Sequence, residues 1–210
     1  MALDLQQTRL YARQIALPAV GAEGQQRLLA ATVVVFRESD VPGAGTTSET
    51  AAEYLRAAGV GKVIVAAAPG ESARWRQALD GVNVALRFAL DDDALVPAAI
   101  EAGVPLVLGR VADDTIDLLA FRQHGGCAHR RPTRPLAAAA RADQAGAAAT
   151  LLAILAATEC LWMLIEPARQ PAARLLRLPL GGGAPRNDEI PWPPACPLCA
   201  AATQTKIKLS

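Results

Sequence analysis

Histidine, lysine and aromatic residues are scarce in this sequence of 210 residues. It contains 2 histidines and 4% aromatic residues, and its only lysines are Lys62, Lys206 and Lys208. The 21 basic side chains are balanced by 20 acidic ones, which gives a formal net charge of +1. Binding to nucleic acid by charge requires an excess of clustered lysine and arginine, so this balance argues against a nucleic-acid partner.

Targeting signals are also lacking. The opening residues, MALDLQQTRLYARQ, contain no basic segment followed by an apolar one, so we expect no secretory signal. The longest apolar segment, Ala145–Ile165, approaches the length of a membrane span. It is rich in alanine rather than leucine and contains Thr150, Thr158 and Glu159, which favours a buried core helix. We therefore expect a cytoplasmic protein with no membrane partner.

Short apolar segments alternate with helical ones along the chain. Thr32–Phe36 (TVVVF) and Lys62–Ala67 (KVIVAA) are typical of buried parallel strands. Between them lies a helical segment for which we expect Ser48 as the N-cap and Gly59 as the stop. A strand, a helix and a strand in this order form a right-handed crossover unit. The sequence therefore predicts an α/β fold, a mostly parallel sheet with helices on both faces.

The same alternation continues to residue 180. We expect further helices over 22–30, 72–79, 92–102 and 145–165, and further strands over 82–88, 104–108, 113–121 and 174–178. Three parts follow from this pattern: an N-terminal arm and helix (1–31), an α/β domain (32–180), and a Gly/Pro-rich connection with a CxxC motif and tail (181–210).

A glycine-containing loop, Gly43-Ala44-Gly45-Thr46-Thr47-Ser48, matches the dinucleotide-binding fingerprint except that Ser48 replaces the third glycine. In a working site the glycines let backbone N–H groups approach a phosphate, and the helix N-terminus stabilises its charge. Here residues 37–42 separate the glycines from the strand, and 66–69 (AAAP) supply no acid for ribose hydroxyls. A nucleotide site and an ordinary loop both stay open.

Cysteine and histidine spacing suggests a metal site. Cys196 and Cys199 form a CxxC motif, which supplies half of a tetrahedral zinc site. Cys127 with His124 or His129 would complete a Cys3His set, and His124 preserves the two-residue spacing. The alternative is a pair of free surface thiols, and a redox dithiol fits less well because no βαβ unit follows the motif. We expect Cys160, inside the long helix, to be a packed core thiol.

Two charged clusters have ordinary explanations. The aspartates of 91–93 begin a helix, where carboxylates favour the positive end of the helix dipole. Arg130, Arg131 and Arg134 could bind an anion, but a solvated loop is the simpler interpretation.

The N-terminal segment 9–21 (RLYARQIALPAVG), followed by GQQRLLAATVVV, resembles the start of the ThiF/MoeB/HesA family, bacterial relatives of ubiquitin-activating enzymes. Residues 51–65 (AAEYLRAAGVGKVIV), IEAGVPLVLG, and RLLRLPL through CPLCA are similar to later parts of that family. The resemblance implies a Rossmann-like nucleotide-binding fold. It also implies a homodimer that adenylates the C-terminal glycine of a ubiquitin-like sulfur carrier with ATP.

The resemblance also implies roles for single residues. Arg13 matches an arginine that reaches the partner subunit's nucleotide, and Asp92 matches a metal-site aspartate. Gly43 and Gly45 match phosphate-loop glycines, with Thr46 and Ser48 where further glycines are expected. Arg76 matches the arginine of a Ser-Asn…Arg-Gln segment in which Ala73 replaces the asparagine. Cys127, Cys196 and Cys199 match three zinc ligands, and Arg130 stands at the fourth, which leaves His124 or His129 as the replacement.

Parts of the family's catalytic apparatus have no counterpart. The section between Gln77 and Asp91 is shortened and takes with it the catalytic lysine, and Ala142 stands at the position of the thioester cysteine. Charge on a transferred adenylyl group must be stabilised by cations and a metal. We therefore expect a pseudoenzyme with structural zinc and without ATP or Mg²⁺, in which the loop 37–42 fills the abandoned pocket.

The expected role of such a protein is binding. It would pair with itself or with an active relative through the family's dimer surface, and a ubiquitin-like carrier protein is the further candidate partner. Two alternatives remain: an active ATP-dependent adenylyltransferase of such a carrier, and a nucleotide or anion binder through Gly43–Ser48.

Overall fold

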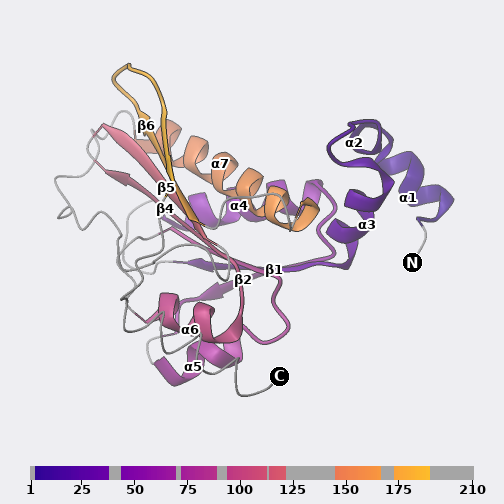
Figure 1. The fold of residues 1–210 in the computed structure, drawn as a ribbon, viewed down its shortest axis with the longest axis horizontal. Coiled ribbons are helices and arrows are strands. Elements are labelled where there is room, and N and C mark those ends of the chain that lie inside the picture. The colour runs from indigo at the N-terminus through magenta and orange to yellow at the C-terminus, as the bar shows by residue number, and fades with distance from the viewer. Residues whose placement is uncertain are drawn as a thin grey trace.

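In a computed structural model, the described part of the chain forms a seven-stranded sheet with helices on both faces (Figure 1). The structure describes residues 3–37, 44–69, 72–88, 94–112, 114–121, 145–166 and 173–189. The strands are β1 (Thr32–Arg37), β2 (Lys62–Ala67), β3 (Val84–Arg87), β4 (Leu106–Ala112), β5 (Thr115–Phe121), β6 (Ala173–Pro179) and β7 (Arg186–Glu189). The helices are α1 (Leu5–Leu10), α2 (Ala12–Ile15), α3 (Gly21–Ala30), α4 (Ala44–Ala57), α5 (Ser72–Ala78), α6 (Leu95–Ala102) and α7 (Ala145–Ile165).

The sheet has a parallel half and an antiparallel half, in the order β2-β1-β3-β4-β5-β6-β7. Strands β2, β1, β3 and β4 run parallel, whereas β5, β6 and β7 each run antiparallel to the preceding strand. Strand β2 pairs with one edge of β1, and β3, which follows it in the chain, pairs with the other edge of β1. The expected α/β fold with parallel core strands is therefore confirmed.

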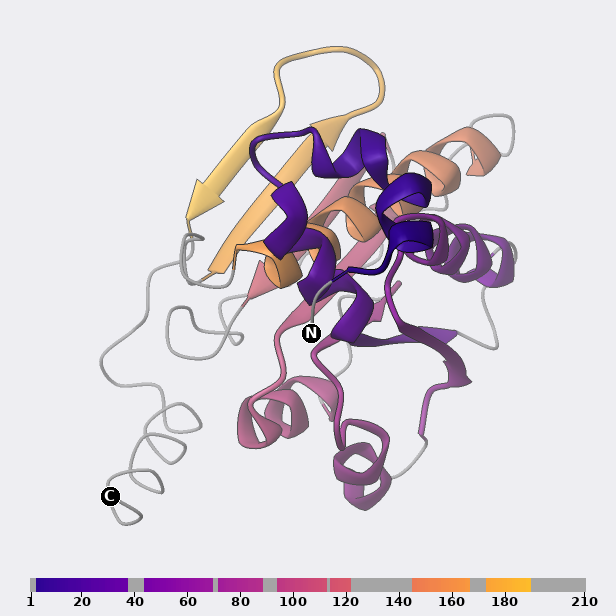
Figure 2. The ribbon, with the colours of Figure 1, turned by 90° about the vertical axis from the view of Figure 1, so that its right-hand side faces the viewer.

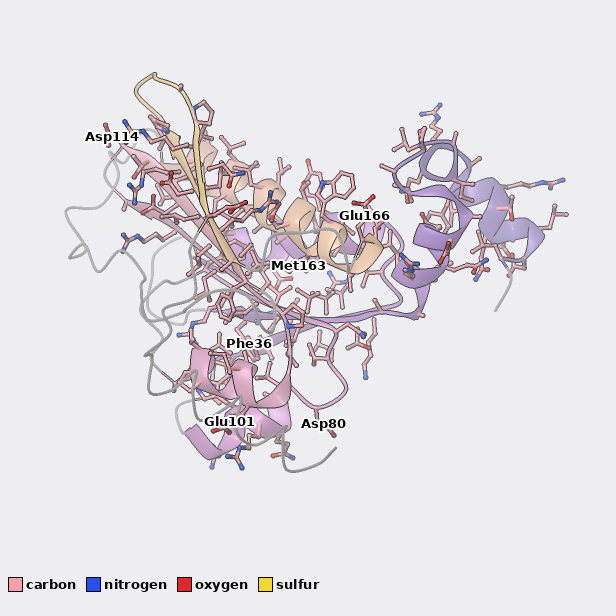
Figure 3. The ribbon with its side chains drawn as sticks, viewed as in Figure 1. Phe36, Asp80, Glu101, Asp114, Met163 and Glu166 are labelled. Atoms are coloured by element: carbon pink, nitrogen blue, oxygen red, sulfur yellow. The ribbon has the colours of Figure 1, made fainter. Side chains whose placement is uncertain are left out.

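Each face of the sheet has its own apolar core. Alternate residues of β1 enter the two cores: Val33 and Val35 pack with residues of α4 and α7, whereas Val34 and Phe36 pack with residues of α5 and α6. Phe36 meets the buried Trp75 edge to face, with ring centroids 4.8 Å apart. Figure 3 shows the two layers, with Met163 of α7 on one side of the sheet and Glu101 of α6 on the other.

The long helix α7 packs against α4 and against β3, β4 and β5, as the sequence predicts for a core helix. Its buried side is made mostly of small residues, which lets the helix approach the sheet closely: Ala148, Leu152, Ala153, Ala156, Ala157, Cys160 and Met163. Burial raises the pKa of the Cys160 thiol, and the Glu159 carboxylate beside it raises that pKa further. In the described ranges, the segment Gly146–Ile165 is long and apolar enough to cross a membrane by length and composition alone, with 50% of that window buried in the fold.

Four elements differ from the sequence prediction. Helix α6 begins at Leu95 rather than at residue 92, so the aspartates of 91–93 precede the helix instead of beginning it, and β4 runs to Ala112 rather than ending at 108.

Ser48 was expected as the N-cap of its helix, but α4 begins at Ala44 and Ser48 lies inside it. Residues 44–47 (AGTT) contain no proline, so they allow the helix to begin before Ser48. The segment after residue 180 was expected to be a connection, but Arg186–Glu189 form β7. All four residues of β7 are exposed, so no apolar alternation marks this strand in the sequence, and pairing with β6 holds it.

The N-terminal arm lies to one side of the sheet, where Figure 1 shows it at the right and Figure 2 shows it facing the viewer. Helices α1 and α2 contain no buried residue. Asp4 closes the start of α1 by a capping box with Gln7. From α3, the buried Gln25 donates a hydrogen bond through Nε2 to the carbonyl of Ala58 at 3.1 Å, and Arg27 donates to the carbonyl of Ile165 at 2.5 Å. These bonds attach α3 to the ends of α4 and α7.

The turn before β2 approaches α3 closely because Gly61 has no side chain. The Gly61 amide donates a hydrogen bond to the Leu28 carbonyl at 3.0 Å. A Cβ atom at this position would lie 2.0 Å from the backbone oxygen of Leu29. Only glycine therefore fits where the arm and the parallel half of the sheet meet.

We expect Gly61→Ala to lower the free energy of unfolding by about 3 kcal/mol, at the upper end of overpacking costs, because a backbone atom must move. Urea denaturation of both variants measures this. Gly146→Ala is the matched control, since a Cβ there meets nothing within 4 Å and alanine in a helix gains up to about 1 kcal/mol over glycine. Equal stability of Gly61→Ala and the wild type would contradict the close approach.

Candidate functional site

The candidate site lies at the carboxyl edge of the parallel strands, where the connections of β1 and β3 diverge to opposite faces of the sheet. Ligands of open α/β sheets bind at such a switch point. In this protein Arg37 ends β1, Ala67 ends β2 and Arg87 ends β3. The chain returns from this edge into α4, so the N-terminus of α4 faces the same region.

The first turn of α4 supplies backbone donors. The N–H groups of the first four residues of a helix have no partner within it, and the helix dipole adds partial positive charge there. Gly45 belongs to this turn, so its N–H has no acceptor within the helix. Ser48 lies one turn later, where an α-helical N–H donates to the carbonyl four residues earlier, here that of Ala44.

The side chain of Ser48 is buried, and its Oγ atom has no hydrogen-bond partner within the part of the chain that the structure describes. Ser48 therefore contributes a buried hydroxyl group inside α4 rather than the backbone donor expected of the fingerprint.

Charges at this edge come from arginine. Arg37 pairs with Glu49 of α4 at 2.5 Å, and both side chains are half-exposed. The Arg87 guanidinium lies over the ring of Trp75, 5.4 Å from its centroid. Ala66 and Ala67, which end β2, are paired with Phe36 and Arg37 of β1. The end of β2 thus offers no carboxylate for ribose hydroxyls, as the sequence indicated.

Two other expected site residues lie away from α4. Arg76 is on α5, on the opposite face of the sheet, and its guanidinium pairs with Glu101 of α6 at 2.6 Å on the protein surface. Arg13 is exposed on α2 in the N-terminal arm. One copy of the chain therefore does not bring Arg13, Ser48 and Arg76 together.

Several expected site residues lie outside the described residues. Their assignments remain predictions from the sequence: Gly43, Asp92, His124, Cys127, His129, Arg130, Ala142, Cys196 and Cys199. The same holds for most of the loop 37–42 that was expected to fill the pocket. Among the residues that the structure does place, no three His, Cys, Asp or Glu side chains are grouped to hold a metal. Cys160 is fully buried, which confirms it as a core thiol.

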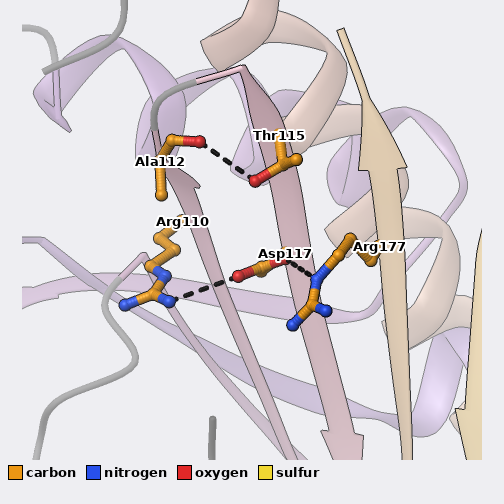
Figure 4. Close-up of polar contacts among 5 residues, drawn as sticks. All are labelled: Arg110, Ala112, Thr115, Asp117 and Arg177. Carbon is orange, nitrogen blue, oxygen red and sulfur yellow. Dashed lines mark hydrogen bonds and ion pairs between the residues drawn. The ribbon is translucent and has the colours of Figure 1, made fainter. Parts of the chain in front are cut away.

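A charged cluster that the sequence did not reveal lies across β4, β5 and β6 (Figure 4). The Asp117 carboxylate accepts hydrogen bonds from Arg110 at 3.2 Å and from Arg177 at 2.9 Å. Nearby, the Thr115 hydroxyl donates to the Ala112 carbonyl at 3.0 Å and closes the turn between β4 and β5. The only available signal was the presence of charges inside apolar strands, one each in β4 and β5 and two in β6, since Asp117 and Arg177 are 60 residues apart.

Solved structures share this fold at low sequence identity. PaaA matches with a TM-score of 0.67 and 13% identity, over 91% of this chain and 76% of that one. MccB of E. coli, solved with MccA-N7isoASN, matches with a TM-score of 0.67 and 12% identity, over 91% of this chain and 74% of that one.

Curated proteins match a shorter segment at higher identity, while no model of a known protein family matches the chain. SAMP-activating enzyme E1 of Haloferax volcanii is 43% identical over 65 residues, which cover 31% of this chain and 22% of that protein. Protein HesA, vegetative, of Trichormus variabilis is 51% identical over 55 residues, which are 26% of this chain and 18% of the relative. The chain is similar to proteins of the ThiF/MoeB family.

A third relative is itself named for adenylyl transfer. Adenylyltransferase and sulfurtransferase MOCS3 of Bos taurus is 44% identical over 62 residues, 30% of this chain and 12% of that protein. These relatives belong to a ThiF/MoeB-like adenylyltransferase family, and the structural neighbours share the fold of this chain. The matched segments span about a fifth or less of each curated relative.

Proposed function

We propose that this ThiF/MoeB-like protein is a non-catalytic family member that acts as a dimerisation and binding partner. The observation that carries the proposal is the composition of the carboxyl edge. Strand β2 ends in Ala66 and Ala67, and the chain has no lysine between Lys62 and Lys206. Among the described residues of this edge, the end of β2 offers a nucleotide no acid for its ribose, and the sequence offers no lysine from this part of the chain for its phosphates.

Ion pairing of the arginines supports the same proposal. Charge that develops on a transferred adenylyl group needs preorganised cations or a metal. Arg37 is paired with Glu49 and Arg76 with Glu101. Before either arginine could stabilise a phosphate, it would have to leave a carboxylate that already neutralises it.

The N-terminal arm supports the dimer. Helices of six and four residues are not stable in isolation, yet α1 and α2 bury no residue against the body of the protein. Leu5, Leu10 and Leu17 are exposed on this arm. A second copy of the chain, or an active relative, would cover these leucines. A ubiquitin-like carrier protein is the further proposed partner, since one relative is named a SAMP-activating enzyme.

Incubation with ATP, Mg²⁺ and a candidate carrier protein is expected to give no ATP–pyrophosphate exchange, whereas an active family member assayed in parallel gives exchange. Thermal unfolding is expected to be unchanged by ATP, because a ligand of the native state would raise Tm with its concentration. Exchange above the level without carrier would contradict the proposal and favour an active adenylyltransferase.

A second candidate function is a nucleotide or anion binder at the N-terminus of α4. The buried Ser48 Oγ, which has no partner in the described ranges, favours it. In the experiment above, this function would raise Tm with ATP or AMP without any exchange. The increase would be smaller in Ser48→Ala, so the two measurements separate this candidate from both the proposed function and an active enzyme.

The proposed role of the arm predicts a dimer that depends on its leucines. We expect Leu10→Glu with Leu17→Glu to raise the dimer Kd at least tenfold, because one buried leucine contributes about 1.5 to 3 kcal/mol. Sedimentation equilibrium measures this Kd. Asp80→Lys, on an exposed turn after α5, is the control and leaves the Kd unchanged. A monomeric wild-type protein would refute the role of the arm.

We also propose a structural zinc ion bound by Cys127, Cys196, Cys199 and His124, with His129 as the alternative fourth ligand. Thiolate and imidazole ligands in this number suit tetrahedral zinc. Metal analysis of the purified protein is expected to find about one zinc per chain, with loss of zinc in Cys196→Ser. Cys160→Ala removes the core thiol instead and is expected to retain zinc. Equal and negligible zinc in wild type and Cys196→Ser would refute the site.

A further inference from the structure

Three neighbouring strands place one aspartate between two arginines. Asp117 of β5 is directly opposite Arg110 of β4 and directly opposite Arg177 of β6. Both arginines donate hydrogen bonds to its carboxylate (Figure 4). These three side chains, here called the arginine row, carry one negative and two positive charges. The row therefore has an excess of one positive charge.

Two of the three side chains of the arginine row are largely buried. The Asp117 side chain is 4% exposed, that of Arg110 is 10% exposed and that of Arg177 is 34% exposed. Buried guanidinium groups require acceptors for their N–H groups. Within the described residues, Arg110 Nε is buried and has no hydrogen-bond partner. The Nε–H group of Arg110 is therefore a buried donor for which the described residues provide no acceptor.

Another arginine of the sheet forms an ion pair in which one guanidinium has a carboxylate to itself. Arg174 of β6 bonds to Glu159 of α7 through both Nε and Nη2, one to each carboxylate oxygen. That pair holds one guanidinium for one carboxylate and has no excess charge. The arginine row shares one carboxylate between two guanidiniums, so within the described residues it has one anionic partner fewer than guanidinium groups.

The row lies at the carboxyl end of β4, on the same face as Arg87. Alternate residues share a face of a strand, and Leu108, Leu119 and Leu175 belong to the core under α5 and α6. Arg110, Asp117 and Arg177 are each two residues from one of these leucines. Arg87 of β3 pairs with Leu108, so it lies one step from Arg110 along the same edge. Guanidinium groups therefore line this face at the carboxyl edge of the sheet.

We propose that the arginine row binds a monocarboxylate ligand, which accepts hydrogen bonds from Arg110 and from the exposed end of Arg177. The guanidinium fork matches the two oxygens of a carboxylate. A single negative charge also neutralises the single positive excess of the row, whereas a triphosphate would exceed it. Small organic acids and the C-terminus of a peptide share this chemistry.

Nitrogen-15 NMR of the arginine Nε–H groups tests this site during titration with sodium acetate, with sodium chloride at equal ionic strength as the control. We expect saturable shifts of the Arg110 and Arg177 signals with acetate only. Trialanine with a free carboxylate is expected to shift the same signals, and its amide is not. Tighter binding of trialanine than of acetate identifies a peptide terminus as the ligand, and equal binding identifies a small acid.

Variants distinguish a binding site from a structural ion pair. Arg177→Gln, at the more exposed arginine, is expected to weaken acetate binding about tenfold or more, since charge-assisted hydrogen bonds are lost. Asp117→Asn removes the competing carboxylate and is expected to strengthen binding. Arg56→Gln, on the exposed end of α4, leaves binding unchanged. Absence of saturable shifts in the wild type, or equal shifts with chloride, would overturn the proposal, whether or not Asp117→Asn folds.

Discussion

Burial of β1 on both of its faces is the constraint on which the rest of the structure depends. Val33 and Val35 lie in one core, and Val34 and Phe36 lie in the other. A buried strand must pair along both edges, because an unpaired backbone group away from water is costly. Strands β2 and β3 provide this pairing in parallel. Their placement on opposite sides of β1 creates the switch point and fixes the N-terminus of α4 beside it.

Arginine pairing determines what the carboxyl edge can bind. Exposed ion pairs such as Arg37–Glu49 contribute about 0 to 1 kcal/mol to stability, so their main effect here is on charge. They neutralise groups that a nucleotide phosphate would otherwise meet. The arginine row differs because its aspartate is buried and shared between two guanidiniums. The same edge therefore combines a neutralised region at β1 with an excess of positive charge at β4 to β6.

Local patterns predicted the elements that bury apolar side chains. The strand 32–36, the helix 22–30 and the core helix 145–165 were expected within a residue of their observed bounds, since each carries a clear apolar run or face. The start of α4 at Ala44 was not expected, because its first turn has no apolar periodicity. Strand β7 was also missed, since all its residues are exposed and only hydrogen bonds to β6 define it.

The sequence by itself determined the α/β class, the family resemblance, the alanines that end β2 and the absence of lysine from the middle of the chain. These features are properties of short segments or of composition. Only the tertiary structure decided that Ser48 is buried within α4, that Arg76 faces Glu101, and that Arg110, Asp117 and Arg177 meet. Such contacts join residues from separate elements, and strand register, which depends on the packing of the whole sheet, sets their partners.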